Sequence, residues 1–359
     1  MDTQIITNPS DQELDMLARA LRNGEIVSIP TETVYGLGAN GLDPEAMDKI
    51  YAAKGRPSDN PLILHVPNSE SIKPLVTEVS NTAQLLMDTF WPGPLTITLP
   101  KSDLVPDRAT GGLPRVALRC PDHAICRALL ERTGVPVAAP SANISGRPSP
   151  TTAQDVYHDM KGRISYILDA GPCMIGVEST VVEVHDDKVI ILRPGGITKA
   201  QLEAVVSTVE YDTALVNATT KPKAPGMKYT HYAPDAPMTV VVGSPEGIAC
   251  TFKELSEGVD GPIGCLVSHE TYNLMKEDTR FIFHCFGNYG DALSLGHDFY
   301  KSLLYFNENH VALILAEGVD DDGFGVAIMN RMEKASSHHI IYKSVSYTHL
   351  RAHETTLHL

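Results

Sequence analysis

The chain has 359 residues, of which 43% are hydrophobic and 20% are charged, an ordinary balance for a globular protein with buried cores. Its 29 basic and 44 acidic residues give a net charge of −15. This charge argues against a protein that coats nucleic acid through bulk positive charge, because such binding relies on neutralising phosphates. A local cationic pocket stays compatible with it, because a site is built from a few residues.

Neither a membrane segment nor a disulfide framework is expected. The sequence has no uncharged apolar run of about 18 residues, so we expect no membrane partner. Its first ten residues lack the basic start and apolar stretch of a secretory signal. None of the six cysteines forms a Cys-x-x-Cys pair, which disfavours zinc sites and disulfides. We therefore expect a cytoplasmic protein with reduced thiols.

The first half of the chain alternates helical and strand patterns. Ser10 and Glu13 form a capping box before a helix, and Asp43-Pro44 opens a second helix that Gly55 and Pro57 end. A third helix is predicted over 82–90, and further helices follow Asp122 and Thr152. Strands are predicted at 25–30, 62–66, 95–99, 116–119, 135–139, 180–184 and 189–192. This pattern predicts an α/β domain with a mixed sheet over residues 1–205.

The second half predicts a connector, a smaller domain and a tail. Residues 206–236 include the run Lys-Pro-Lys-Ala-Pro-Gly at 221–226, which is a poor helix or inner strand because proline fixes φ and removes donors. Residues 237–343 predict a smaller α/β domain, with a helix at 292–306. Its buried strands are expected at 238–242, 263–267, 281–285 and 311–315. Residues 344–359 lack periodicity and caps, so we expect a tail that is non-native to the fold or disordered.

The clearest candidate site is the run from Lys54 to Pro61. Lys54 lies seven residues after Met47, on the predicted inner face of its helix, and Arg56 follows across a glycine that permits a sharp turn. A lysine and an arginine held between prolines form a rigid donor set suited to phosphate oxygens. The alternative is a solvated surface pair, which the flanking glycine and prolines disfavour.

Three other polar segments follow or border predicted strands, where ligands of open α/β sheets bind. They are residues 140–146 with Ser141 and Asn143, residues 31–38, and residues 176–182, joined by Arg193 at the end of the next strand. Each alone is compatible with a turn that satisfies its own backbone. Together they predict a polar cleft. His65 either reaches this cleft or lies in the core with its hydrogen bonds satisfied.

Two nucleotide motifs are disfavoured. Residues 36–41 match Gly-x-Gly-x-x-Gly by letter, but the next predicted helix starts at Asp43-Pro44, after the glycines. A dinucleotide fingerprint requires the glycines at the turn that opens the helix. The sequence also lacks the Gly-x-x-x-x-Gly-Lys-Ser/Thr run, so any ATP is held without a P-loop.

Ordered segments along most of the chain carry a resemblance to a known family. They are PTETVYGLG at 30–38, AKGRPSDNPLILH at 53–65, WPGPLT at 91–96, APSANISG at 139–146, GVESTVV at 176–182 and LRPGG at 192–196. The chain resembles the threonylcarbamoyl-adenylate synthases in their long form. PGMKYTHYAP at 225–234 and GFGVAIMNRMEK at 323–334 resemble the linker and closing segment of that form.

The resemblance implies a fold and an activity. The fold is α/β, a YrdC-like twisted mixed sheet with flanking helices plus a second, smaller Rossmann-like α/β domain. The activity joins L-threonine, bicarbonate and ATP into L-threonylcarbamoyl-AMP and pyrophosphate, with Mg²⁺ accompanying ATP. A separate downstream tRNA threonylcarbamoyl transferase would pass the product to an adenosine beside the anticodon.

The resemblance also implies roles for single residues. The signature set around the triphosphate is Lys54, Arg56, Ser141 and Asn143. ATP binding falls on Arg56, Asn60, Ala139, Ser141, Ser149 and Arg193, with His231 and Tyr232 as a lid over the nucleotide. Threonine binding falls on Thr33, His65, Arg119 and Ser179, and an arginine suits its carboxylate because the guanidinium forms a bidentate pair.

One departure and two alternatives remain open. Arg115 stands where the family has a small hydroxyl residue, so it contributes either a phosphate contact or only its backbone. The first alternative is a module that binds RNA weakly through a cationic surface, which the net charge of −15 disfavours. The second is an NAD-dependent enzyme that uses residues 36–41.

Overall fold

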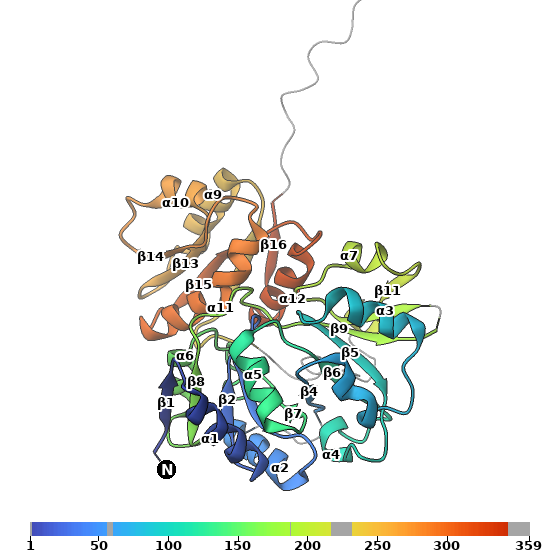
Figure 1. Ribbon diagram of the computed structural model, residues 1–359. Coiled ribbons are helices and arrows are strands. Elements are labelled where there is room, and N and C mark those ends of the chain that lie inside the picture. The colour runs from blue at the N-terminus through green and yellow to red at the C-terminus, as the bar shows by residue number, and fades with distance from the viewer. Residues whose placement is uncertain (1, 56–59, 187, 217–231, 344–359) are drawn as a thin grey trace, which may run out of the picture.

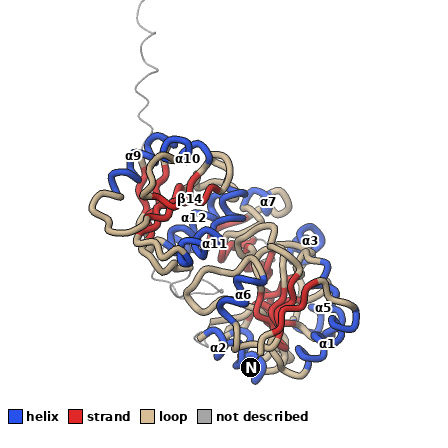
Figure 2. Tube along the Cα trace, turned by 90° about the vertical axis from the view of Figure 1, so that its left-hand side faces the viewer, coloured by secondary structure: helices blue, strands red, loops and turns tan. Residues whose placement is uncertain are grey.

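Two β-sheets organise the chain. The computed structural model describes residues 2–55, 60–186, 188–216 and 232–343 (Figure 1). The first sheet has eleven strands and belongs to residues 2–216, which we term the N-terminal unit. The second has five strands and belongs to residues 232–343, the C-terminal unit. Figure 2 shows the two groups of strands apart, each with its own helices.

The eleven-stranded sheet is mixed, as the sequence predicts. Five neighbouring pairs are parallel and five are antiparallel. In spatial order its strands are β1 (Gln4–Thr7), β8 (Tyr166–Asp169), β2 (Val27–Ile29), β3 (Gly36–Asn40), β7 (Val137–Ala138), β4 (Ile63–His65), β6 (Arg115–Arg119), β5 (Leu95–Pro100), β9 (Thr180–Val184), β10 (Val189–Arg193) and β11 (Val209–Tyr211).

Helices cover both faces of this sheet. Helices α1 (Asp11–Arg22) and α5 (Ala124–Thr133) share one core with alternate residues of β2 and β7. Helices α2 (Pro44–Lys54), α3 (Asn81–Phe90) and α6 (Ala153–Met160) share the core on the other face. Shorter helical segments are η1 (Ser69–Leu75), α4 (Asp107–Thr110), α7 (Lys199–Glu203) and α8 (Thr213–Val216).

Helix ends follow from local sequence. The predicted capping box of Ser10 and Glu13 is present at α1. Asp43 caps α2 with Pro44 in its first turn, and Gly55 ends that helix in the left-handed region at φ +62°. Glycine is favoured there because other residues meet a steric cost from Cβ. This stop fixes where Lys54, the last residue of α2, lies relative to the sheet.

The C-terminal sheet is entirely parallel, with helices on both faces. Its spatial order is β14 (Phe281–Cys285), β13 (Ile263–Val267), β15 (Leu313–Glu317), β12 (Met238–Val242) and β16 (Ile340–Tyr342). Helices α9 (Pro245–Leu255) and α10 (His269–Met275) pack on one face, and α11 (Ala292–Glu308) and α12 (Gly325–Ala335) on the other. The predicted strand at 311–315 lies two residues later, at β15.

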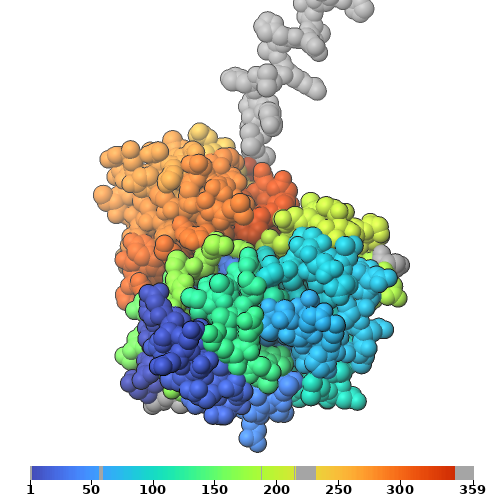
Figure 3. Space-filling view, in the orientation of Figure 1, coloured from blue at the N-terminus to red at the C-terminus, as the bar shows by residue number. Residues whose placement is uncertain are grey.

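The C-terminal unit rests directly on the N-terminal one (Figure 3). Helices α11 and α12 lie between the C-terminal sheet and the N-terminal unit, and Val34, Val177 and Tyr232 join their hydrophobic core. The predicted tail at 344–359 lies outside the described residues. Among the described helices, none combines the length and the apolar composition needed to cross a bilayer.

Strand β3 was not predicted, because its sequence Gly-Leu-Gly-Ala-Asn resembles a loop. A Cβ at Gly38 would lie 2.9 Å from the carbonyl oxygen of Val27 and 3.0 Å from Cγ1 of Val137. Close packing of β3 between its neighbours therefore requires glycine. The glycines of the 36–41 motif lie in β3 and just after it. They do not lie at the turn that opens α2, and this position before the helix is the one that the sequence predicts.

We predict that Gly38→Ala lowers the free energy of unfolding by about 1–3 kcal/mol, because the backbone of β2 cannot recede without disturbing the sheet. Urea unfolding monitored by circular dichroism measures this change. Gly247→Ala is the matched control, since its Cβ would meet nothing nearer than 3.5 Å and α9 gains a better helix former. An unchanged urea midpoint in Gly38→Ala would contradict the packing explanation.

Candidate active site

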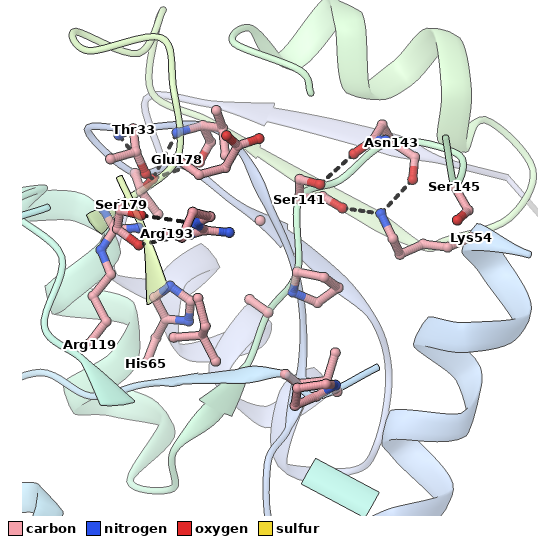
Figure 4. A pocket seen from close by; sticks show the side chains of 18 of the residues that line it. Thr33, Lys54, His65, Arg119, Ser141, Asn143, Ser145, Glu178, Ser179 and Arg193 are labelled. Carbon is pink, nitrogen blue, oxygen red and sulfur yellow. Dashed lines mark hydrogen bonds between the residues drawn. The ribbon is translucent and has the colours of Figure 1, made fainter. Parts of the chain in front are cut away.

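The predicted polar segments meet around one pocket in the N-terminal unit. It encloses about 750 Å³, counting space open to solvent. Its lining comes from the segments after β2 and β7, the end of α2, strands β4, β6 and β10, and the segment before β9. Figure 4 shows two groups of side chains on opposite sides of it.

The first wall consists of Lys54, Ser141 and Asn143. Lys54 is 2% exposed, and its Nζ donates to the carbonyl oxygens of Asn143, at 2.6 Å, and of Ser141. The Ser141 hydroxyl donates to Oδ1 of Asn143 at 2.5 Å. The Asn143 amide in turn donates to the carbonyl oxygens of Ile144 and Arg147, both at 2.8 Å. These bonds fix an ammonium and a hydroxyl at the pocket wall.

The second wall consists of Thr33, His65, Arg119 and Ser179. His65 and Arg119 are directly paired residues at the ends of the parallel strands β4 and β6, so the sheet register places them side by side. The Ser179 hydroxyl lies 2.8 Å from the Thr96 hydroxyl, and the Thr33 hydroxyl lies 2.9 Å from that of Thr31. All four predicted residues line the pocket.

A buried ion pair holds Arg119. Its Nη2 lies 2.8 Å from Oε2 of Glu32, and both side chains are less than 5% exposed. Burial first, and then the charge of Arg119, lower the pKa of His65 to about 3, so this imidazole is neutral near pH 7. Its Nδ1 has no hydrogen-bond partner within the described residues. The wall thus offers a guanidinium, a neutral imidazole and two hydroxyls.

Glu178 and Arg193 border both walls. Arg193 donates from Nε to the carbonyl oxygen of Ser179 at 3.1 Å and from Nη2 to its hydroxyl at 3.2 Å. Glu178 accepts a hydrogen bond of 2.6 Å from the Ser149 hydroxyl. Burial alone would raise the pKa of Glu178, but the charges of Arg331 and Arg193 and the Ser149 bond lower it to about 2. The carboxylate is therefore ionised at neutral pH.

The remaining predicted site residues lie in different places. Ala139 and Tyr232 line the pocket, whereas Ser149 lies behind Glu178, outside the lining. Asn60 is 2% exposed and its Nδ2 has no partner among the residues the structure describes. Arg56 and His231 lie outside the described residues.

A second cavity adjoins the pocket through Pro61 and Leu62, which line both. It encloses about 740 Å³ by the same measure and is lined largely by apolar atoms. Arg115 borders it, with Nη2 donating to the carbonyl oxygens of Thr98, at 2.7 Å, and of Val184, at 2.8 Å. The guanidinium that departs from the family pattern thus binds the backbone of strands β5 and β9.

Glu32 and Glu178 were not predicted as site residues. Both belong to segments that were quoted for their motifs, yet a single acidic residue in such a segment shows no sign of its partner. The opposite charges lie 87 and 153 residues further along the chain, at Arg119 and Arg331. Which carboxylate faces which cation depends on the pairing of distant strands and helices.

The described residues contain no group of three or more His, Cys, Asp or Glu side chains that could hold a metal ion. Glu178, which lines the pocket, and Glu32, which lies behind Arg119, are already paired with arginines. These side chains therefore do not fit a dedicated Mg²⁺ cage, which would require several free oxygen ligands.

Two family models match the chain in succession. The model described as telomere recombination matches residues 19–195. The model described as the C-terminal domain of threonylcarbamoyl-AMP synthase matches residues 197–337. Together they span nearly all of the N-terminal unit and most of the C-terminal unit.

Curated relatives and solved structures agree with these models. The threonylcarbamoyl-AMP synthase of Bacillus subtilis is 46% identical over 92% of this chain and 95% of the relative. That of Pyrococcus abyssi is 42% identical over the same shares. The crystal structure of P. abyssi Sua5 complexed with L-threonine superposes with a TM-score of 0.86 at 40% identity, over 95% of this chain and 100% of that one. The predicted resemblance is confirmed, and the chain belongs to the threonylcarbamoyl-AMP synthase family in its long, two-part form.

Proposed function

We propose that this chain condenses L-threonine, bicarbonate and ATP into L-threonylcarbamoyl-AMP and pyrophosphate. One observation carries the proposal: a wall of ammonium, hydroxyl and amide groups faces a wall with a guanidinium and a neutral imidazole across one pocket (Figure 4). The first wall suits phosphate oxygens, and the second suits an amino acid. A reaction between an amino acid and a nucleotide requires both within one enclosure.

Threonine occupies the second wall in this proposal. Its carboxylate pairs with the Arg119 guanidinium, whose Nη2 lies 2.8 Å from Oε2 of Glu32. Its hydroxyl and amine lie among Thr33, Ser179 and the neutral imidazole of His65. The solved relative with bound L-threonine supports the presence of an amino-acid site in this fold.

ATP occupies the first wall and the space beyond it. Lys54, Ser141, Asn143 and Arg193 surround the phosphates, and Ser149 supports this side through its hydrogen bond to Glu178. Asn60 is a further nucleotide-binding residue in the proposal. The adjoining apolar cavity, reached past Pro61 and Leu62, is suited to a flat purine base. Tyr232, which is 5% exposed, closes the pocket on the side of the connector.

The chemistry needs orientation and charge neutralisation rather than a side-chain nucleophile. The threonine amine attacks bicarbonate and water leaves, which gives a carbamate. A carbamate oxygen then attacks the α-phosphorus, and the bond to the bridging oxygen breaks as pyrophosphate departs with the electron pair. Lys54 and Arg193 stabilise the negative charge that develops on the phosphate oxygens.

Mg²⁺ enters this proposal as part of the ATP complex, held by phosphate and water oxygens rather than by the protein. The product is a mixed anhydride, so a separate transferase that acts on tRNA must consume it. We place the protein in the cytosol, where ATP is supplied and thiols stay reduced, in agreement with six free cysteines.

The proposal predicts that the purified chain releases pyrophosphate from ATP only when threonine and bicarbonate are both supplied. Coupled pyrophosphate detection measures turnover, and mass spectrometry identifies the threonylcarbamoyl adduct of AMP. Omission of each small substrate in turn is the control. Pyrophosphate release that does not depend on threonine, or does not depend on bicarbonate, would contradict the proposed reaction.

Lys54→Met should lower kcat by about 10²–10³-fold, because the variant removes a fixed charge beside the developing phosphate charge. The matched control is Lys49→Met on the same helix, where the lysine is exposed and its Nζ bonds the carbonyl oxygen of Gly24. Lys49→Met should keep kcat within about twofold of the wild type. A Lys54→Met enzyme within tenfold of the wild type would remove Lys54 from the mechanism.

Arg119→Lys should raise the KM for threonine by about 10- to 100-fold, because lysine cannot form the bidentate pair with a carboxylate. The variant keeps a positive charge beside Glu32, so the fold is expected to tolerate it. ATP affinity, measured by equilibrium titration without threonine, should remain unchanged. An equal loss of affinity for both substrates would argue against a threonine site at this wall.

A further inference from the structure

A buried ionic cluster joins the C-terminal unit to the pocket. The Glu178 carboxylate accepts hydrogen bonds from Ser149 at 2.6 Å, from the Tyr300 hydroxyl at 3.1 Å and from Nε of Arg331 at 3.1 Å. Tyr300 belongs to α11 and Arg331 to α12. Among the described residues, two of these three side-chain donors to a pocket carboxylate thus come from the C-terminal unit.

Arg331 contacts two pocket segments at once. Besides Glu178, it contacts Pro194, the residue that directly follows Arg193. The carbonyl oxygen of Pro194 accepts a hydrogen bond of 2.6 Å from Nη1 of Arg331. Arg331 is fully buried, and its guanidinium lies 6.0 Å from the ring centre of Tyr232. The Tyr232 ring in turn lies 5.2 Å from that of Tyr300. One side chain therefore ties together the segments of Glu178, Arg193 and Tyr232.

The surrounding packing leaves this contact little freedom. Gly176, two residues before Glu178, approaches α11 so closely that a Cβ there would lie 2.4 Å from the carbonyl oxygen of Gly296 and 2.6 Å from Cα of His297. Val177 is fully buried in the core of α11 and α12. The loop that carries Glu178 is thus clamped to the C-terminal helices through backbone contact as well as charge.

The charges show what Arg331 does for the pocket. An ionised Glu178 lines a space that, in our proposed function, receives a triphosphate, and like charges repel in a low-dielectric site. Arg331 balances that carboxylate from the side away from the pocket. Glu178 can then accept the hydrogen bond of Ser149 and attract the positive charge of Arg193. Its own negative charge, balanced by Arg331, does not repel the phosphates of ATP.

We propose that Arg331 and Tyr300 are positioning residues through which the C-terminal unit completes the nucleotide half of the pocket, by neutralising and orienting Glu178. This inference rests on the proposed function. It gives the C-terminal unit a direct part in nucleotide binding, although neither residue lines the pocket. Removal of the Arg331 charge then weakens ATP binding and leaves threonine binding nearly intact.

The test uses the full chain and equilibrium titration with a non-hydrolysable ATP analogue, which needs no turnover. We expect Arg331→Met to weaken analogue binding by at least about tenfold, because it leaves a buried carboxylate unpaired. Combining it with Glu178→Gln should restore most of this loss, since glutamine keeps an acceptor for Ser149 and Tyr300 without the charge. Tyr300→Phe should cause a smaller loss, of about threefold to tenfold.

Arg280→Met is the matched control, because Arg280 is an exposed arginine of the C-terminal unit paired only locally with Asp278. It should bind the analogue as the wild type does. Threonine affinity, titrated separately, should change by less than about twofold in all variants, because the Arg119 wall is not part of the cluster. A structural defect would instead weaken both ligands and would not be relieved by Glu178→Gln.

Analogue affinity within twofold of the wild type in Arg331→Met would overturn the inference. A loss that persists in the double variant would overturn it as well. If Arg331→Met does not fold, the analogue affinity of Tyr300→Phe is the deciding measurement. An unchanged affinity in that variant counts against the inference. Failure of the proposed function is distinguishable, because a wild type that binds the analogue but releases no pyrophosphate rejects the reaction and not the coupling.

Discussion

The pocket depends on the constraint that a buried cation in its wall, or directly behind it, must have a fixed acceptor. An unpaired charge inside a protein costs several kcal/mol, so Arg119 requires Glu32 and Arg331 requires Glu178. Lys54 meets the same constraint differently, through the carbonyl oxygens of Ser141 and Asn143. Each acceptor lies on a segment distant in sequence from its cation, and the pair of Glu178 and Arg331 joins the two units.

The choice of acceptor sets the charge that each wall presents. Glu32 cancels the charge of Arg119, so the second wall is close to neutral and suits a zwitterion such as threonine. Two backbone carbonyl oxygens accept hydrogen bonds from Nζ of Lys54 and hold this ammonium at the first wall, where it suits phosphate groups. The difference is built into the protein before either substrate arrives. The two walls thus offer different chemical groups to the two substrates.

Local sequence predicted the parts of the site that local structure determines. The end of α2 at Gly55 places Lys54, and the strand before Pro140 places Ser141, so both could be assigned from motifs. The buried ion pairs could not be assigned in this way. Glu178 and Arg331 lie 153 residues apart, and Arg331 belongs to a helix whose sequence shows only an amphipathic pattern. Strand β3 was not predicted for a related reason. Its glycines are required by neighbouring strands that the sequence alone does not identify.

Helices α11 and α12 explain why the second unit carries polar residues inside an apolar interface. Both helices are amphipathic and bury apolar side chains in a core that also includes Val34 and Val177 of the N-terminal unit. Apolar packing alone would tolerate several rotations and shifts of one unit on the other. The Arg331 guanidinium adds directional contacts, because it meets both Glu178 and the carbonyl oxygen of Pro194. The buried pair therefore connects α12 to the segments that carry Glu178 and Arg193, and Glu178 in turn accepts the hydrogen bond of Ser149.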